Sequence, residues 1–399
     1  MQILTHHNLY VGMIEALKMI IEEEEYTDRA IEKIFKQNRL WGSRDRGFVA
    51  EMIYDMVRWK RKINFVSGNT LKKRHYWDFI GAWVLMNDGE LPDYEEFQGL
   101  KRDKILAAMR QAYKHPAIQH SVSDELNAIG LAQLGEDWYA ELEELNIPAS
   151  AIIRVNSLRA TAQDVKAEFR DLDIEIVKLK RYEDAYALRE KANIFKTDAF
   201  QKGWFEMQDA SSQLVAPFCE VEPGMRVADT CAGAGGKTLH LAALMQNKGQ
   251  IMAMDIYQNK LNELKRRAKR DGAHNIQTKL IDSKQLKRWK GSFDRVLIDA
   301  PCTGSGVLKR NPDAKYKINN EFLNNVKATQ AEVLDNYSKL MKDDGLLMYV
   351  TCSIFPAEND KQIEHFLQNH PEFELKEEKK IWPSETGFDG FYMAKLGKK

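Results

Sequence analysis

The stretch Asp229-Thr-Cys-Ala-Gly-Ala-Gly-Gly-Lys-Thr238 decides the fold, because it joins a short apolar strand to an apolar helix. The strand is Met225–Ala228 and the helix is Leu239–Met245. The three glycines between them permit tight turns, and they let the backbone approach a ligand at the helix N-terminus. A strand, a glycine-rich turn and a helix in this order predict a ligand site in an α/β sheet.

Three kinds of nucleotide site compete for this loop. A P-loop requires a glycine at position 231, where Cys231 stands, and the dinucleotide fingerprint requires a glycine at position 238, where Thr238 stands. An acidic residue, here Asp229, followed by a glycine-rich turn is typical of an S-adenosylmethionine pocket. The loop therefore favours S-adenosylmethionine, although it does not decide the matter alone.

Strands and helices alternate from residue 225 onward. Each strand is short and nearly continuously apolar, which is typical of a parallel sheet covered by helices on both faces. The five predicted strands are Met225–Ala228, Gln250–Met254, Ile276–Leu280, Arg295–Ile298 and Leu346–Val350. Ligands of such sheets bind beyond the carboxyl ends of the strands, so the residues at those ends are the candidates for function.

Two aspartates follow the second and third of these strands. Asp255 stands about twenty residues beyond the glycines, where a carboxylate can accept both ribose hydroxyls of an adenosine. Asp282 is placed to accept from an adenine amino group. Either aspartate alone could simply cap the helix that follows it. Together with the glycine loop, in this order and spacing, they indicate an adenosine-containing ligand.

The fourth and fifth strands lead into cysteine-containing loops. One loop is Asp299-Ala-Pro-Cys-Thr-Gly-Ser-Gly306 and the other is Tyr349-Val-Thr-Cys-Ser-Ile354. Two adjacent strands thus present Cys302, Cys352 and an aspartate to one crevice. A free cysteine is only a few per cent thiolate at neutral pH, so a nucleophilic cysteine needs a basic neighbour. Lys237 is the electropositive neighbour that we expect.

The remaining cysteines and the N-terminal residues indicate the environment in which the protein works. Cys219 is expected to be a buried apolar side chain. The four cysteines form no CxxC pair and no zinc pattern with histidine, so neither a metal site nor a disulfide is expected. No apolar run is long enough to span a membrane, and the N-terminus lacks a secretory signal. We expect a cytoplasmic protein, most simply a monomer.

The 399 residues are too many for one ordinary core, and the patterns suggest three domains. Apolar spacings of three and four predict helices throughout residues 1–140, including one continuous helix over Ser43–Phe65. A small α/β segment follows over 141–210, with strands at Ala151–Asn156 and Ile174–Leu179. Residues 211–399 form the Rossmann-like domain that carries the glycine loop.

Global charge gives no indication of a nucleic-acid partner, because 59 basic residues balance 59 acidic ones. Two local runs are basic. Arg58–Arg74 holds seven basic residues and no acidic one, and Lys260–Lys290 holds eleven against three. Such runs can follow a phosphate backbone, but a solvated helix face explains them at least as often.

The motifs together resemble the RsmB/Nop/Sun family of RNA cytosine-5 methyltransferases. The resemblance covers the chain from about Arg154 to the C-terminus, and Asp-Ala-Pro-Cys combined with Thr-Cys-Ser is its most specific part. The other matching segments are Arg154-Val-Asn156, Met207-Gln-Asp-Ala-Ser-Ser-Gln213, Arg310-Asn-Pro-Asp313 and Asp389-Gly-Phe-Tyr392. A class I S-adenosylmethionine-dependent methyltransferase domain of α/β type is the fold that this resemblance implies.

The resemblance also implies a role for each matching residue. Cys352 would attack carbon 6 of cytosine, and Asp299 would hold N3 and the exocyclic amine. Carbon 5 would then take the methyl group, and Cys302 would assist release of the enzyme, with Lys237 organising the pocket. The implied cofactor-binding residues are Cys231, Ala232, Gly233, Ala234, Gly235, Gly236, Lys237, Asp255, Asp282 and Asp299.

The glycine loop departs from the family, which usually has Cys-Ala-Ala-Pro-Gly-Gly-Lys where this chain has Cys231-Ala-Gly-Ala-Gly-Gly-Lys237. Loss of the proline should make the turn less rigid. In the helical region, Ser43-Arg-Asp-Arg-Gly-Phe48 followed by Val57-Arg58 resembles NusB-like domains, and the small α/β segment resembles RNA-recognition modules. The NusB-like resemblance favours 16S ribosomal RNA as the substrate, with transfer RNA as the alternative.

Two other classes of protein compete with this interpretation. A methyltransferase acting on an amine, a protein or a small molecule would need no nucleophilic cysteine, and a DNA cytosine enzyme would use Cys302 without needing Thr-Cys-Ser. A ribosome-assembly factor that has lost its chemistry would keep the fold alone. Every residue that the cytosine-5 mechanism requires is present, which favours an enzyme.

Overall fold

The computed structural model describes residues 6–190 and 192–399. The chain forms two compact units. The first comprises the residues up to Asn146 together with Arg310–Asn319, and the second comprises Ile147–Lys309 and Asn320–Lys399. The segment Arg310–Asn319 therefore belongs to a unit whose other residues lie more than 160 positions earlier in the sequence.

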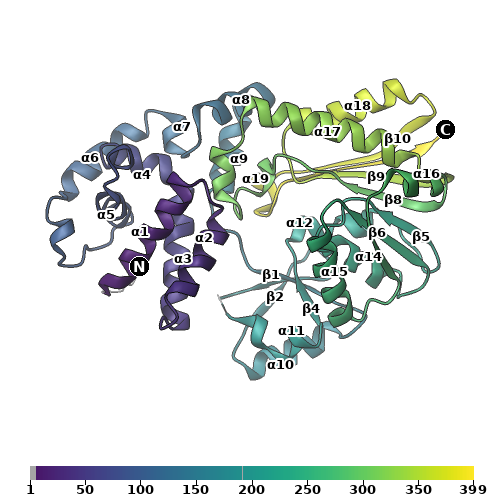
Figure 1. The fold of residues 1–399 in the computed structure, drawn as a ribbon, viewed down its shortest axis with the longest axis horizontal. Coiled ribbons are helices and arrows are strands. Elements are labelled where there is room, and N and C mark those ends of the chain that lie inside the picture. The colour runs from purple at the N-terminus through teal and green to yellow at the C-terminus, as the bar shows by residue number, and fades with distance from the viewer. Residues whose placement is uncertain (1–5, 191) are drawn as a thin grey trace. The chain divides into compact units, whose positions relative to one another are not determined.

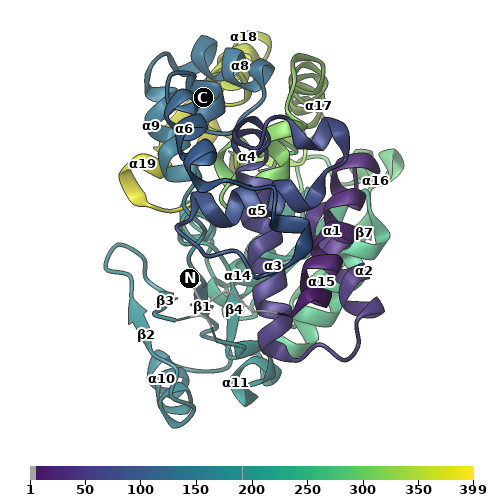
Figure 2. The same cartoon turned by 90° about the vertical axis from the view of Figure 1, so that its left-hand side faces the viewer.

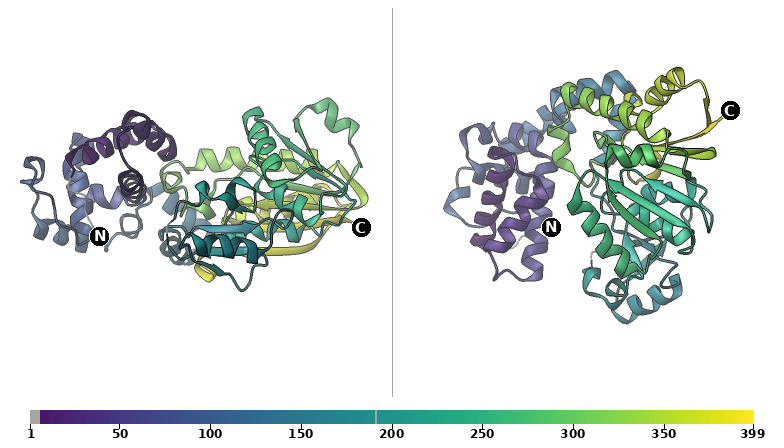
Figure 3. Two further views of the ribbon diagram at one scale, coloured as in Figure 1. Left: turned by 90° about the horizontal axis from the view of Figure 1, so that it is seen from below. Right: turned by 45° about the vertical axis from the view of Figure 1, so that its right-hand side comes forward.

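The first unit is helical, as predicted. Helices α1, α2 and α3 pack against one another (Figure 3), and their shared core includes Tyr10, Met13 and Ile53. Its helices are α1 (His7–Glu22), α2 (Thr27–Gln37), α3 (Ser43–Arg58), α4 (Lys60–Val66), α5 (Tyr76–Met86), α6 (Arg102–Ala112), α7 (Pro116–Gln119), α8 (Asp124–Leu134) and α9 (Asp137–Leu145), with 3-10 turns η1 (Thr70–Lys73), η2 (Glu95–Phe97) and η5 (Pro312–Tyr316).

The prediction of one continuous helix over Ser43–Phe65 is wrong at one point. The chain breaks at Trp59, whose φ of −105° and ψ of 16° interrupt the helical geometry between α3 and α4. The Nζ atoms of Lys62 and Lys315 lie 5.2 and 5.5 Å from the centre of its ring. The indole thus lies near two cationic side chains of the same unit.

Much of the basic run Arg58–Arg74 lies inside the first unit, rather than on a solvated face. Arg58 is only 4% exposed and Lys62 only 8%. Burial lowers the pKa of Lys60 to about 8. The fully exposed basic side chains of this run are confined to Lys72–Arg74 at its end.

The late segment Arg310–Asn319 contributes a buried lysine to the first unit. The side chain of Lys315 is fully buried, and its Nζ donates to the carbonyl oxygens of Arg58 at 3.0 Å and His120 at 3.3 Å. It also donates to Oδ1 of Asn146. Burial holds the pKa of Lys315 well below its usual value. Three acceptors from separate parts of the helical region therefore meet at one side chain of this segment.

The second unit begins with a small antiparallel sheet of order β2-β3-β1-β4. Helices α10 and α11 lie on the same face of this sheet (Figure 2), where Val165, Phe169 and Phe205 form the core. The strands are β1 (Ile152–Val155), β2 (Ile176–Lys178), β3 (Ala185–Leu188) and β4 (Phe205–Met207), and the helices are α10 (Ala162–Asp171), η3 (Ile194–Lys196) and α11 (Asp198–Gln201). The sequence predicted β1 and β2, but not β3 and β4.

The large sheet has seven strands in the order β10-β11-β9-β8-β5-β6-β7. Strands β9 to β7 in this order are parallel, as the apolar runs predicted, whereas β11 pairs antiparallel with β9 and β10 antiparallel with β11. The strands are β5 (Arg226–Asp229), β6 (Gln250–Asp255), β7 (Ile276–Leu280), β8 (Phe293–Asp299), β9 (Met341–Thr351), β10 (Phe373–Ile381) and β11 (Phe391–Lys398).

Helices cover both faces of the large sheet (Figure 1). Helices α17 and α18 pack on one face around Phe293 and Leu334, and α14 and α15 pack on the other around Leu241 and Ile251. The helices and 3-10 turns of this part are α12 (Ala210–Gln213), α13 (Val215–Phe218), α14 (Gly236–Leu244), α15 (Gln258–Asp271), α16 (Ser283–Arg288), η4 (Ser305–Val307), α17 (Asn320–Ser338), η6 (Pro356–Glu358), α18 (Asp360–Asn369) and α19 (Pro383–Thr386).

The chain order of the strands reverses beside β5. From β5 the chain proceeds outward through β6 and β7, and β8 returns to the opposite side of β5. This is the topological switch point, where open α/β sheets bind their ligands. The described part of the chain contains no helix with the length and apolar run that a membrane crossing requires.

Candidate active site

The glycine loop leaves β5 and enters α14 through two left-handed residues. Gly233 has a φ of 53° and Gly235 a φ of 91°, values that side-chain-bearing residues rarely adopt. A Cβ at Gly235 would lie 2.3 Å from the side chain of Leu264, whereas a Cβ at Gly233 or Gly236 would meet nothing within 4 Å. The backbone at these two glycines therefore borders open space, which suits the close approach of a ligand.

Asp255 ties the end of β6 to this loop. One carboxylate oxygen accepts the backbone N–H of Gly233 at 2.8 Å, and the other accepts that of Tyr257 at 2.8 Å. Asp282 follows β7, is exposed, and accepts the N–H of Lys284 at 3.0 Å. Both aspartates therefore make the local turn contacts expected of caps, and both lie at the carboxyl ends of strands in the same half of the sheet.

Lys237 and Asp299 form an ion pair between the glycine loop and the end of β8. Lys237 Nζ donates to Asp299 Oδ2 at 2.6 Å and lies 5.3 Å from the centre of the Phe391 ring. Burial would lower the pKa of Lys237, but Asp299 and the neighbouring Cys352 outweigh it and raise that pKa. The ammonium group thus stays charged beside a carboxylate and a thiol.

The two loop cysteines meet, as the strand ends predicted. Cys302 Sγ and Cys352 Sγ are 3.1 Å apart, and both side chains are partly buried. The contact with Cys352, together with burial, raises the pKa of the Cys302 thiol well above its usual value. Cys302 therefore keeps its proton in the free enzyme, and at most one of the two sulfurs carries a negative charge.

The other two cysteines are unsuited to nucleophilic chemistry. Cys219 is fully buried and its thiol donates to the carbonyl of Val215, which confirms the structural role expected for it. Burial, with the neighbouring carboxylates Asp299 and Asp229, raises the pKa of Cys231. Cys302 and Cys352 are therefore the two cysteines whose surroundings suit such chemistry.

The buried carboxylate of Glu358 joins the two cysteine loops. It accepts the backbone N–H of Thr303 at 2.8 Å and the hydroxyl of the same residue at 2.6 Å. From the other loop it accepts the hydroxyl of Ser353 at 2.5 Å, and from α17 the amide of Gln330 at 3.1 Å. Sequence reasoning missed Glu358, because its function depends on partners about 55 residues away in the Thr303 loop.

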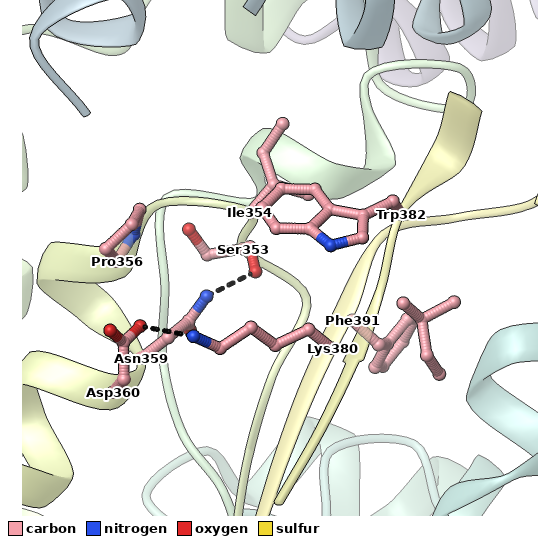
Figure 4. Close-up of a pocket in the computed structure, with 9 residues that line it drawn as sticks. Ser353, Ile354, Pro356, Asn359, Asp360, Lys380, Trp382 and Phe391 are labelled. Carbon is pink, nitrogen blue, oxygen red and sulfur yellow. Dashed lines mark hydrogen bonds and ion pairs between the residues drawn. The ribbon is translucent and has the colours of Figure 1, made fainter. Parts of the chain in front are cut away.

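A small cavity lies beside the Cys352 loop (Figure 4). Ser353, Ile354, Trp382 and Phe391 are among its lining residues, and its volume is about 30 Å³. That volume has room for about one water molecule and is too small for a nucleobase. It is part of the packing that holds the loop in place.

The small sheet supports the cofactor side of the site through Arg267 of α15. Its guanidinium donates to the carbonyl of Ala234 in the glycine loop at 2.8 Å and to Glu206 of β4 at 2.8 Å. Asn156 of the Arg-Val-Asn segment donates to the carbonyls of Gly203 and Asp271 at 2.8 and 2.9 Å. The motif that the sequence analysis noted on β1 thus joins the small sheet to the end of α15.

The described residues, 6–190 with 192–399, contain no group of three or more histidine, cysteine, aspartate or glutamate side chains that could hold a metal ion. The predicted catalytic residues Cys352, Cys302, Asp299 and Lys237 do gather at adjoining strand ends. Their arrangement offers a nucleophile, a second thiol, a carboxylate and a fixed positive charge, which are the groups that covalent attack on an electron-poor ring requires.

Comparison with known proteins gives consistent results. Residues 218–397 match the family model described as 16S rRNA methyltransferase RsmB/F. The "Probable ribosomal RNA small subunit methyltransferase B" of Bacillus subtilis is 28% identical, over 97% of this chain and 98% of that protein. The "Ribosomal RNA small subunit methyltransferase B" of Serratia proteamaculans is 32% identical, over 65% of this chain and 62% of that protein.

Solved structures agree in fold. The crystal structure of PH0851 covers 100% of both chains with a TM-score of 0.84 at 24% identity. A methyltransferase homolog protein from Pyrococcus horikoshii has a TM-score of 0.63 at 26% identity, over 71% of this chain and 98% of that one. The glycine loop, the strand-end aspartates and these relationships agree on S-adenosylmethionine as the cofactor, and the chain is an S-adenosylmethionine-dependent RNA methyltransferase whose residues 218–397 resemble the RsmB/F family.

Proposed function

We propose that the protein methylates carbon 5 of a cytosine in 16S ribosomal RNA through a covalent bond between Cys352 and the base. The observation that carries the chemistry is the pair of sulfurs 3.1 Å apart beside the Lys237–Asp299 ion pair. A relative named for the ribosomal small subunit that aligns with nearly the whole chain supports the choice of RNA, and such a substrate implies a cytoplasmic enzyme.

The cofactor fits the glycine side of the site. The open space at Gly233 and Gly236 accommodates a ligand against the backbone, with Asp255 and Asp282 at the ribose and adenine. Residues 231–237 and Asp299 complete this surface. S-adenosylmethionine, when bound, supplies an electrophilic methyl group.

The first step forms a bond between Cys352 Sγ and carbon 6 of cytosine. As the bond forms, the thiol proton leaves Cys352 and a proton is taken up at N3, so that Asp299 accepts from the N3–H and the exocyclic amine, where charge develops. The Lys237 ammonium, 2.6 Å from Asp299, supplies the compensating positive charge. Carbon 5, made electron-rich by the attack, is then the atom that accepts the methyl group.

The second step restores the aromatic base and frees the enzyme. Cys302 removes the proton from carbon 5, the ring double bond reforms, and the bond from carbon 6 to Cys352 breaks. Once Cys352 is bonded to the base, the contact between the two thiols that raises the pKa of Cys302 is lost, and Cys302 can release its proton to solvent. Adduct formation thus allows Cys302 to act as a thiolate base at the moment when one is needed.

The test is whether a Cys302→Ala variant remains attached to RNA. We expect the variant, isolated under denaturing conditions after incubation with 16S ribosomal RNA and S-adenosylmethionine, to carry covalently bound RNA. The adduct should be absent from the double variant C302A/C352A, and sequencing the bound RNA would identify the cytosine. If the bound RNA proved to be transfer RNA, the proposed substrate would be wrong and the proposed mechanism would stand.

Two results would overturn the proposal. If C302A forms no adduct while the wild-type protein methylates RNA, the roles of the two cysteines are wrong. If the wild-type protein neither binds S-adenosylmethionine nor methylates RNA, the chain is an assembly factor on a methyltransferase fold.

A further inference from the structure

A basic groove runs between α15 and β7, at the end of the large sheet opposite β10. Its volume is about 610 Å³, and α15 and β7 lie side by side in Figure 2. The residues that line this groove, which we call the α15–β7 groove, are Leu264, Lys265, Ala268, Lys269, Ala273, His274, Ile276, Gln277, Thr278 and Lys279. Three lysines and a histidine therefore face a floor of small and apolar residues, and the lining contains no acidic residue.

The three lysines of the groove are free to bind an external anion. Lys265, Lys269 and Lys279 are exposed, and none forms an ion pair with another residue in the described part of the chain. Two arginines of α15, in contrast to these lysines, do form ion pairs. Arg267 and Arg270 pair with Glu206, which is only 4% exposed. Helix α15 thus turns these arginines toward a structural carboxylate and its lysines toward solvent.

The excess of basic residues over Lys260–Lys290 is concentrated, because the whole chain is neutral. A second groove of the same unit, between α10 and α11, shows the contrast. Four carboxylates line it, those of Asp164, Glu168, Asp171 and Asp198, together with Lys196 and Lys202. Of these two grooves, only the α15–β7 groove combines a recess with a positive charge that no neighbour compensates.

A structural explanation exists for part of this charge. Lysines on a strand at the edge of a sheet prevent pairing with another chain, and β7 is such a strand. That explanation covers Lys279. It does not cover Lys265 and Lys269, which project from a helix at positions i and i+4 and therefore share one face.

We propose that the α15–β7 groove binds the phosphate backbone of the RNA substrate outside the catalytic centre. Helix α16, which follows β7 in the chain, carries two further exposed lysines, Lys284 and Lys287. This inference rests on the proposed function and adds to it the surface on which the RNA lies.

The position of the groove indicates that it contributes to RNA affinity rather than to the methyl-transfer reaction. Strand β7 is four strands away from β9, which carries Cys352, so about 19 Å separate them at about 4.8 Å per strand. A phosphate bound in the groove is thus several nucleotides from the target base. Contacts there strengthen binding of substrate and transition state equally, which lowers KM and leaves kcat unchanged.

The experiment compares two triple variants on the shortest 16S ribosomal RNA fragment that the wild-type protein methylates. In the groove variant, K265Q/K269Q/K279Q, we expect the slope of log Kd against log salt to fall by about 2 to 3. The wild type should then lose about 15- to 60-fold more affinity than this variant between 50 and 200 mM salt. KM should rise and kcat at saturating RNA should stay the same.

The control variant, K104Q/K361Q/K399Q, removes the same charge from three exposed lysines scattered over the rest of the chain. Its slope should match that of the wild type. An unchanged slope in the groove variant, or an equal fall in slope in both variants, would refute RNA binding in the groove while leaving the methyltransferase proposal intact. Failure of the wild-type protein to bind or methylate any 16S fragment would instead refute the proposed function.

Discussion

Glu358 is a buried carboxylate whose acceptors are filled by donors from both cysteine loops and from α17. Hydrogen bonds to a charged group contribute more than neutral ones, and a buried carboxylate tolerates no gap among its partners. The distance between the two sulfurs is therefore set in part by a residue that lies outside both loops. Glu358 is a positioning residue for the cysteine pair.

Replacing Glu358 with glutamine should misplace the loops. The new NH2 group would oppose one of the existing donors, so we expect a loss of about 1.5–3 kcal/mol in the free energy of unfolding. We also expect kcat to fall at least tenfold with little change in KM for S-adenosylmethionine. Thermal unfolding and single-turnover methylation measure the two effects.

The matched control is Glu364→Gln on the exposed face of α18, which should change neither quantity. In the C302A background, E358Q should also slow formation of the covalent adduct. A variant that lost stability but formed the adduct at the wild-type rate would show that Glu358 supports the fold alone.

Asp229 predicts a pH dependence of stability. Burial raises its pKa to about 7, although Thr238 donates to it at 2.6 Å. Its pKa is higher in the folded state than in the unfolded chain, so the folded protein binds the extra proton between about pH 4 and 7. Its contribution to stability is complete below this window and is lost as the pH rises through 7.

The variant Asp229→Asn cannot ionise, and we expect it to match the wild type near pH 4 and to be more stable at pH 8 by on the order of 2–4 kcal/mol. Denaturant unfolding of the cofactor-free protein at the two pH values measures this difference. Equal differences at pH 4 and pH 8 would mean that the pKa of Asp229 is not raised in the folded protein.

Side chains with a strand-end position could be predicted from the sequence, whereas those defined by tertiary partners could not. Cys302, Cys352, Asp299 and Lys237 follow apolar strands or the glycine turn, and the structure brings them together. Arg267 stands in a run of basic residues with nothing local to distinguish it. Its contact with Ala234 arises only because α15 packs beside the loop.

Among the elements, the five parallel strands were predictable because burial on both faces makes them continuously apolar. Strand β10 escaped prediction for the opposite reason. Only its end residues Phe373 and Ile381 are buried, and the residues between them are mostly charged. The length of β9 was underestimated, because its first half, Met341–Gly345, includes two exposed aspartates.

Substitutions at two neighbouring glycines in the turn between β5 and α14 should separate effects on folding from effects on cofactor binding. Gly235→Ala places a Cβ against Leu264 at a φ of 91°, so we expect both stability and S-adenosylmethionine binding to be lost. Gly236→Ala meets no atom within 4 Å and lies at an ordinary φ, so the fold should remain.

The methyl group that the Gly236→Ala substitution adds would nevertheless occupy space that we assign to the cofactor. We therefore expect an unchanged unfolding temperature and a Kd for S-adenosylmethionine raised about tenfold, or about 1.4 kcal/mol. Calorimetry of each variant gives both numbers. Unaltered cofactor binding by the G236A protein would place the ligand away from this glycine.

Over the whole molecule, the segment Arg310–Asn319 makes the first unit discontinuous in sequence. Lys315→Met removes a donor from three buried acceptors, and we expect the first unit to lose about 2–4 kcal/mol of stability. Hydrogen exchange of the amides in α3 reports this loss in the full chain.

Lys317→Met is the comparison within the same segment. Its ammonium lies 3.4 Å from the centre of the Tyr26 ring, and its side chain is 35% exposed, so its loss should cost less than about 1 kcal/mol. Equal exchange in the two variants would mean that Lys315 contributes no more than a surface lysine.

The same discontinuity has a consequence for how the protein is made. The ribosome finishes Asn146 long before it reaches Arg310, and at about 5–20 residues per second the interval is about 8–33 seconds. Throughout that time the nascent helical region lacks Lys315, so its buried oxygens have no donor from that side chain. The part of the chain that is synthesised first must therefore wait for one of the later segments before its buried contacts are complete.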